Sequence, residues 1–347
     1  MATDKAEKIN KIINDPRHMT EDMLAGYLFL YGDLFEGIPG TKGGLKKRAT
    51  REKVSVVIGG GGGNEPWCLG YVGEGLADAL VCGNVYAAPP AIAILDVTRN
   101  LYHQKGVLYV GTNHMGDILN FELVGELAGL DNIRTRSVFV NDDVASDLRR
   151  KENRRGVAGI ALTVKIAGAV SEAGLDLDQC TEITKRAAEN IRTISVTTSP
   201  GYYPGNGKAM FELPPGMMEY GMGFNGEPGI LREPLAPARD IVRKMLSLLT
   251  EDLPLREKDE SYALLINGFG FTSCLEMHIV AKETGDYFAE KGLPLYHADL
   301  KNIFCPQGTG GFSLSLLKID ETLAPFYDAP CESPLFIRER LRGGKRI

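Results

Sequence analysis

A run of five glycines is the clearest setting for ligand chemistry in this sequence. The apolar stretch 54–58 has the composition of a buried strand and leads directly into the glycines 59–63, which are followed by Asn64. In open α/β sheets, ligands bind beyond the carboxyl ends of the strands. Glycines there let a ligand approach the backbone amides, because no Cβ is in the way. We therefore expect the glycine run to form one wall of a binding site.

Two familiar glycine-rich motifs do not fit this run. A phosphate-binding P-loop needs Gly-Lys-Ser/Thr after the glycines, and no lysine follows them here. A dinucleotide-binding turn needs a third glycine where Asn64 stands. It also needs an acidic residue at the end of the second strand, a role for which Asp78 is poorly placed. A tight glycine turn without any ligand stays open as an alternative.

A second short loop contains His114 and precedes Asp117. Residues 107–110 have a strand pattern and residues 117–129 a helix pattern, so the loop 111–116 connects them. Asp is favoured at helix N-caps, which gives Asp117 a purely structural interpretation beside any chemical one. His114 is either a proton carrier or an ordinary histidine. The other four histidines lie in no motif and no pair has metal-ligand spacing, so we predict no metal on this chain.

Strand–loop–helix alternation predicts an α/β protein with two α/β domains, each a mixed, largely parallel sheet flanked by helices. The boundary is expected near residue 192, giving domains 1–192 and 193–347. Residues 34–51 are rich in Gly and Lys and are expected to be irregular. Further strands are expected at 133–140, 194–198, 218–224, 262–266 and 312–318, and further helices at 1–15, 67–80, 156–173, 177–191, 237–249 and 274–290.

The composition argues against two classes of binding partner, nucleic acids and membranes. The chain has 347 residues, a natural size for two α/β domains, and its 44% hydrophobic and 24% charged residues are typical of soluble globular proteins. A net charge of -6 argues against binding of a nucleic-acid backbone, which needs a basic face. The longest apolar stretch, 85–97, contains two prolines and is too short to span a bilayer. We expect a cytoplasmic protein with no nucleic-acid or membrane partner.

Eight segments together carry a family resemblance: 59–66, 70–76, 81–87, 116–122, 141–145, 154–159, 219–230 and 311–318. In their order and combination they resemble the substrate-binding subunit of dihydroxyacetone (glycerone) kinases over nearly the whole chain. The resemblance implies two α/β domains and a homodimer. It also implies that ATP or ADP with Mg²⁺ is bound by a separate helical kinase subunit and that this chain carries no cofactor.

The family uses two histidines that this sequence lacks. One of them holds the ketose covalently and the other assists proton transfer, and Asn225 and Asn64 occupy their positions here. A carboxamide nitrogen has a delocalised lone pair and does not titrate near neutral pH. Neither asparagine can therefore attack a carbonyl or act as a general acid or base. In addition, Thr112 replaces a family lysine and His114 a family aromatic residue.

Asp117 is retained, and the resemblance implies that it is the base for the hydroxyl that receives the phosphoryl group. Two functions follow. One is a kinase subunit for a small ketose or polyol held without a covalent bond, since phosphoryl transfer needs chiefly positioning and electrostatic stabilisation. The other is a non-catalytic, ligand-sensing or regulatory paralogue. The candidate residues are Asp117 as the catalytic group, and Gly61, Asn64, Thr112, His114 and Asn225 as substrate-binding groups.

Overall fold

The computed structural model describes residues 11–47, 52–101, 104–203 and 206–339. The α-helices of this part are α1 (Met19–Tyr31), α2 (Ala91–Asn100), α3 (Met115–Leu130), α4 (Ile160–Glu172), α5 (Leu177–Glu189), α6 (Ala238–Asp252), α7 (Cys274–Lys291) and α8 (Ala324–Asp328). The strands are β1 (Phe35–Ile38), β2 (Gly43–Lys46), β3 (Ser55–Gly62), β4 (Ala79–Val85), β5 (Val107–Thr112), β6 (Thr135–Val140), β7 (Ile191–Ser199), β8 (Met217–Tyr220), β9 (Leu231–Pro234), β10 (Ser261–Gly268), β11 (Leu295–Lys301), β12 (Gly310–Ile319), β13 (Cys331–Glu332) and β14 (Ile337–Arg338).

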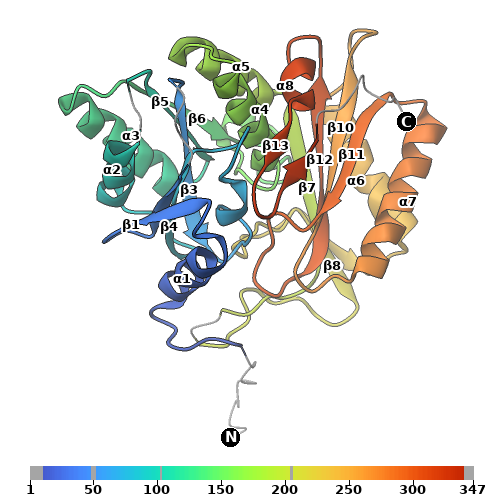
Figure 1. The fold of residues 1–347 in the computed structure, drawn as a ribbon. Coiled ribbons are helices and arrows are strands. Elements are labelled where there is room, and N and C mark those ends of the chain that lie inside the picture. Colours follow the sequence, from blue (N-terminus) through green and yellow to red (C-terminus); the bar gives the residue numbers. More distant parts are fainter. Residues whose placement is uncertain (1–10, 48–51, 102–103, 204–205, 340–347) are drawn as a thin grey trace, which may run out of the picture.

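The first sheet has the strand order β1-β2-β4-β3-β5-β6. The strands β4, β3, β5 and β6 pair in parallel, and the hairpin β1–β2 adds an antiparallel edge. Helices α2 and α3 pack on one face of this sheet, and α4 and α5 pack on the other (Figure 1). The carboxyl ends of β3 and β5 therefore lie side by side at one edge of the sheet, which is where this architecture places ligands.

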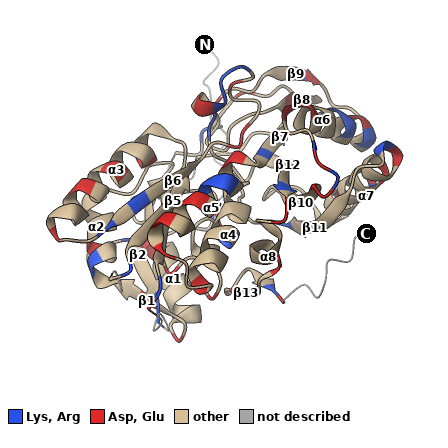
Figure 2. Ribbon diagram, turned by 90° about the horizontal axis from the view of Figure 1, so that it is seen from above, with Lys and Arg blue, Asp and Glu red and all other residues tan. Residues whose placement is uncertain are grey.

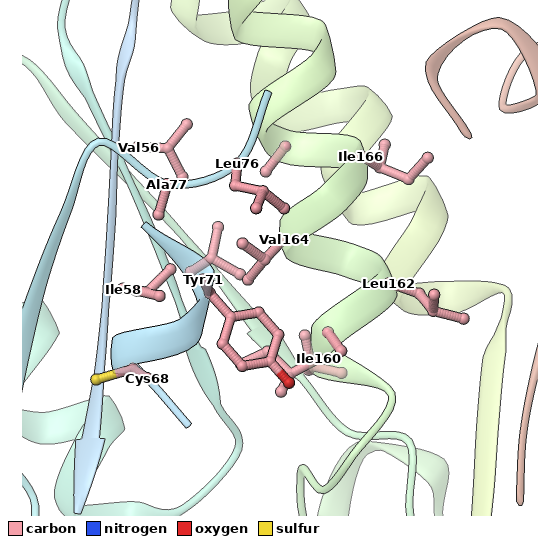
Figure 3. Packing of buried hydrophobic residues seen from close by; sticks show 14 of the residues in the cluster. Val56, Ile58, Cys68, Tyr71, Leu76, Ala77, Ile160, Leu162, Val164 and Ile166 are labelled. Carbon is pink, nitrogen blue, oxygen red and sulfur yellow. The ribbon is translucent and has the colours of Figure 1, made fainter. Parts of the chain in front are cut away.

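Alternate residues of β3 feed two separate hydrophobic clusters. Val56 and Ile58 point to the side of α4, where Figure 3 shows them near Ile160 and Val164, whereas Val57 points to the side of α2 and α3. This is the two-residue period of a strand that is covered on both faces, and it explains the nearly continuous apolar sequence of β3. The sheet that ends in the glycine run is thus anchored by apolar packing on both sides.

The second sheet has the order β11-β10-β12-β7-β8-β9, and β10 and β11 form its one parallel pair. The prediction of mixed sheets flanked by helices is confirmed, but this sheet is mainly antiparallel and not largely parallel. Helices α6 and α7 cover its outer face (Figure 1). On β10, Leu264 and Ile266 face that outer layer, while Ala263 and Leu265 join the central cluster that also contains Ile58 and Ile160. The two sheets therefore share one apolar core.

Three predictions of local structure are wrong, or lie partly outside the residues that the structure describes. The expected helix 67–80 is only a 3-10 turn at Leu69–Tyr71, because Gly75 has φ +65° and a Cβ on Gly73 would lie 2.0 Å from the Glu332 carbonyl oxygen. Residues 34–51 contain the β1–β2 hairpin and are not wholly irregular. Of the expected helix 1–15, residues 1–10 lie outside the described part and residues 11–15 are not helical. The domain boundary near residue 192 stays a prediction.

Charged residues of both signs are interspersed along the helices and loops (Figure 2). This mixed distribution accompanies the net charge of -6 and gives no support to a basic face for nucleic acid. In the described residues, no helix combines the length and the apolar composition that crossing a membrane requires.

Candidate active site

A cavity of about 440 Å³ lies between the two halves of the molecule. Its walls come from the end of β3, the loop after β4, the β5–α3 loop and the turn that follows β8. All six residues that the sequence predicted as site residues line it: Gly61, Asn64, Thr112, His114, Asp117 and Asn225. The other lining residues are Gly60, Trp67, Tyr86, Ala87, Ala88, Gly116, Gly156, Phe224, Glu227 and Phe304. Residues far apart in the sequence thus meet around one space.

The glycine run is part of β3 and not a loop beyond it, because the strand continues to Gly62. Backbone packing explains the need for glycine: a Cβ on Gly61 would lie 2.8 Å from the backbone nitrogen of Ala87. At Gly63 the backbone turns with φ +99°, and its N–H donates to the Glu65 carboxylate at 2.7 Å. This turn carries Asn64 from the strand end into the cavity wall.

Asn64 and Asn225 contact each other in the cavity wall. The Asn64 Nδ2 donates to the Asn225 Oδ1 at 3.0 Å, which joins a residue of the first half to one of the second. The Asn64 side chain is buried, and its Oδ1 has no hydrogen-bond partner in the described part of the protein. A buried amide oxygen without a partner costs free energy, which makes this amide an unsatisfied polar group in the cavity wall.

The β5–α3 loop brings Thr112, His114 and Asp117 together. Thr112 ends β5 and donates through its hydroxyl to the Asp117 Oδ2 at 2.6 Å, and the His114 Nδ1 lies 3.0 Å from the same Thr112 Oγ1. The N-cap of α3 is His114, and Asp117 is the third residue of the helix, so the N-cap interpretation of Asp117 is wrong. A carboxylate in the first turn still gains from the helix dipole.

The protonation of Asp117 is set by opposing effects. Burial raises the pKa of Asp117, while the hydrogen bond from Thr112 and the charge of His114 lower it in part. The net direction is upward, which makes the side chain a better proton acceptor than an exposed aspartate. A buried carboxylate with a raised pKa at the rim of a polar cavity has the properties of a general base.

Glu227 is the site residue that sequence reasoning passed over. Its Oε1 lies 3.7 Å from the His114 Nε2, and its Oε2 accepts the backbone N–H of Asn225 at 3.0 Å and lies 3.9 Å from the Arg155 Nη1. Burial raises the pKa of Glu227, but the interactions with His114 and Arg155 more than offset it and bring the pKa to about 2. The available signal was the Gly-Glu-Pro sequence directly after Asn225.

Aromatic residues form the apolar part of the cavity. The Trp67 ring stacks on Phe304 at 5.5 Å between centroids, and Phe224 meets Phe304 edge-on at 5.2 Å. Tyr86 donates its hydroxyl to the Met210 sulfur at 3.2 Å. These rings line the cavity together with the two amides, and the chain's single tryptophan was their one conspicuous sequence signal.

In chemical terms the cavity can accept a proton at Asp117 and can exchange hydrogen bonds with several hydroxyls. It has no thiol or amine nucleophile among its lining residues. Across the described residues, no group of three or more His, Cys, Asp or Glu side chains is arranged to hold a metal ion.

The model of the Dak1 domain matches residues 26–335, which is most of the chain. The chain belongs to the Dak1 domain family. It is 34% identical over 330 residues to the dihydroxyacetone-binding subunit of PTS-dependent dihydroxyacetone kinase 2 of Listeria innocua, a match that covers 94% of this chain and 99% of the relative.

Two solved structures in this Dak1 group have the same fold. The dihydroxyacetone kinase of C. freundii in complex with AMP-PNP and Mg²⁺ matches with a TM-score of 0.84 and 26% identity, covering 96% of this chain and 63% of that one. A co-activator of a dihydroxyacetone kinase operon also matches with a TM-score of 0.84 and 26% identity, covering 90% of this chain and 96% of that one. A kinase and an operon co-activator thus share the architecture of this Dak1 protein.

Proposed function

We propose that this protein is a dihydroxyacetone kinase-like substrate-binding subunit that holds a small ketose or polyol without a covalent bond while one hydroxyl of that ligand receives a phosphoryl group. The observation that carries the proposal is the position of Asp117, buried in the same cavity as the amides of Asn64 and Asn225. A proton acceptor and two neutral hydrogen-bonding groups suit a ligand that is rich in hydroxyls.

In this proposal Asp117 accepts the proton of the acceptor hydroxyl. As the hydroxyl oxygen forms its bond to phosphorus, the bond between phosphorus and the donor's leaving oxygen breaks, and the hydroxyl proton passes to the carboxylate. The raised pKa of Asp117, caused by burial, favours this transfer. Phosphoryl transfer makes modest demands on a base, so positioning of the hydroxyl beside Asp117 is the larger contribution.

The two amides hold the ligand. The Asn64 and Asn225 amides each carry a donor and an acceptor, and each can reorient toward the hydroxyls of a ligand. The backbone amide of Gly61 is a further donor on the cavity wall. Thr112 and His114 complete the polar lining beside the base. Hydrogen bonds of this kind discriminate a ketone from a polyol less strongly than a covalent bond does, so the acceptor is proposed to carry more hydroxyls than dihydroxyacetone.

The phosphoryl donor is proposed to come from a second protein. The Listeria relative is a binding subunit of a PTS-dependent kinase, and the C. freundii structure, of which this chain covers 63%, contains AMP-PNP and Mg²⁺. These similarities support a separate helical subunit that carries ATP or ADP with Mg²⁺, with either ATP or a phosphocarrier protein as the ultimate source. We also propose that the chain forms a homodimer and works in the cytoplasm.

A second candidate function is ligand sensing without transfer. The similarity to the operon co-activator favours it, as do the amides that stand where the family's histidines are expected. Such a protein would bind the same class of ligand in the same cavity. It would make no use of a base, so Asp117→Ala would leave its ligand affinity and its regulatory response intact.

The deciding experiment is turnover of a panel of C3 to C5 ketoses and polyols, with the helical subunit present and either ATP or the phosphocarrier system as donor. Formation of a phosphorylated product that depends on Asp117 is the expected result. Binding of a panel member by calorimetry with no product under either donor system would overturn the kinase proposal and leave the sensing function.

A further inference from the structure

Four polar side chains form a continuous row along one wall of the cavity. Glu227 meets His114 at 3.7 Å, His114 meets Thr112 at 3.0 Å, and Thr112 meets Asp117 at 2.6 Å. The row begins on the turn after β8 in the second half and ends on α3 in the first half. Thr112 and Asp117 are buried, whereas the side chains of His114 and Glu227 are about one third exposed, at 30% and 32%.

Proton counting fixes the direction of the bonds in this row. A threonine hydroxyl has one proton, and Thr112 gives it to the Asp117 Oδ2. The contact between Thr112 and the His114 Nδ1 can then be a hydrogen bond only if Nδ1 carries a proton and donates it. The geometry therefore selects the form of His114 that is protonated on Nδ1.

The charge at the other end of the row acts on the second ring nitrogen. Glu227 is held as a carboxylate by the Asn225 N–H and by Arg155, which is itself paired with Asp143 at 2.8 Å. Besides His114 and Arg155, the Tyr86 phenol is the titratable group that faces this carboxylate. A bare Nε2 lone pair beside a carboxylate is repulsive, whereas a protonated Nε2 is attracted to it. A proton on Nε2 as well would place an imidazolium between two carboxylates.

We propose that His114, held as an imidazolium by Glu227, is the positive charge that keeps the buried Asp117 ionised and, through Thr112, leaves one Asp117 oxygen free for the acceptor hydroxyl. His114, Thr112 and Glu227 are then positioning residues, and Asp117 is the group that touches the ligand. The inference rests on the proposed function and adds a source of positive charge beside Asp117. An opposite charge at this range favours the ionised form of a carboxyl group.

Nuclear magnetic resonance can test the row in the protein without any turnover. The Asp117 ¹³Cγ signal, assigned by its loss in Asp117→Asn, gives the titration midpoint of that carboxyl group. The matched variants are His114→Gln, Glu227→Gln and, as a control, His278→Gln, which changes an exposed histidine on α7. Loss of the imidazolium should raise the Asp117 midpoint by about one pH unit in the first two variants and leave it unchanged in the control.

The histidine side chain gives an independent measurement. Long-range ¹H–¹⁵N spectra should show His114 protonated on Nδ1, with Nε2 losing its proton at lower pH in Glu227→Gln than in the wild type. An unchanged Asp117 midpoint in His114→Gln, or a neutral His114 protonated on Nε2 alone, would overturn the proposal. A raised midpoint in His114→Gln but not in Glu227→Gln would overturn the part assigned to Glu227. His114→Asn takes the place of His114→Gln if that variant does not fold.

Kinetics separate this inference from the function on which it rests. If the acceptor panel is turned over, the acid limb of the kcat/KM profile should move to higher pH in both variants by the same shift that the Asp117 signal shows, and an unmoved limb would overturn the role of the row in catalysis. If no acceptor is turned over, the kinase proposal fails, and the magnetic resonance result still decides whether His114 controls the charge of Asp117.

Discussion

The two sides of the cavity differ in the kind of chemistry they can perform. On one side Asp117, Thr112, His114 and Glu227 form a row of polar groups with a carboxyl group at each end. On the other side Asn64 and Asn225 form a neutral amide pair that does not titrate. Under the proposed function, proton handling and ligand holding are therefore assigned to different sides of the cavity. A histidine pair in the same places would combine both tasks.

Removal of the proposed base should cause the largest loss of activity. Asp117→Asn keeps the shape of the side chain but cannot accept a proton, so we expect kcat/KM to fall by roughly 10²- to 10⁴-fold, the usual contribution of a general base. Ligand affinity, measured by calorimetry, should change little, because the amide pair is intact. Asp178→Asn on the exposed face of α5 is the matched control. A fall of less than tenfold would mean that the charged side does not handle the proton.

The second prediction introduces a nucleophile on the amide side of the cavity. Asn225→His places an imidazole beside Asn64, and its free lone pair can add to a carbonyl. We expect a covalent adduct with dihydroxyacetone by native intact-mass measurement, whereas the wild type and Asn225→Gln show none. An adduct on the wild type would contradict the view that the amide side holds its ligand by hydrogen bonds alone.

Truncation of the amides should give a smaller effect that differs in kind. Asn64→Ala and Asn225→Ala each remove hydrogen bonds to the ligand, with an expected loss of about 1 kcal/mol, or roughly fivefold in Kd. The pH dependence of turnover should stay as in the wild type for Asn64→Ala, because this side chain does not titrate, whereas the Asn225 side chain also donates to Glu227 at 3.5 Å. Asn100→Ala, at the exposed end of α2, is the control. A shifted pH profile in Asn64→Ala would show that the two sides are not independent.

Much of the first sheet could be predicted from sequence because its strands are covered on both faces. The apolar runs of β3 and β5, and the helix after His114, follow from period and composition. The pattern of β4 is equally apolar, but the helix predicted over 67–80 runs into its first two residues, and residues 81–85 are assigned to no element from sequence. The tertiary contact of Gly73 with the Glu332 carbonyl overrides that helix pattern, and no local signal reveals such a contact.

The pairing of the second sheet and the role of Glu227 were harder to predict. The strand patterns of β7, β10 and β12 were visible, but period alone does not tell parallel from antiparallel neighbours. The edge strand β11 has no fully buried residue and gave no signal. Glu227 lies 3.7 Å from His114 although the two are more than 100 residues apart in sequence, so its place in the row depends on long-range packing. The family motifs indicated which residues form the site, but the sequence did not show that Glu227, His114, Thr112 and Asp117 lie in one row.

The smallest predicted effect concerns stability and gives the two carboxyl groups of the cavity opposite signs. Burial raises the pKa of Asp117, so its ionisation costs stability as the pH rises through its folded pKa. Glu227 has a pKa lowered to about 2, so its ionised form stabilises the fold above the ordinary carboxyl range, and that stability is lost as the pH falls toward 2.

We therefore expect Asp117→Asn to raise Tm at pH 7 and Glu227→Gln to lower it. Both differences should shrink at pH 3 in thermal melts, with the exposed Asp33→Asn unchanged throughout. Tm shifts of the same sign in the two variants would contradict this prediction, because they would show that the two carboxyl groups do not have opposite effects on the stability of the fold.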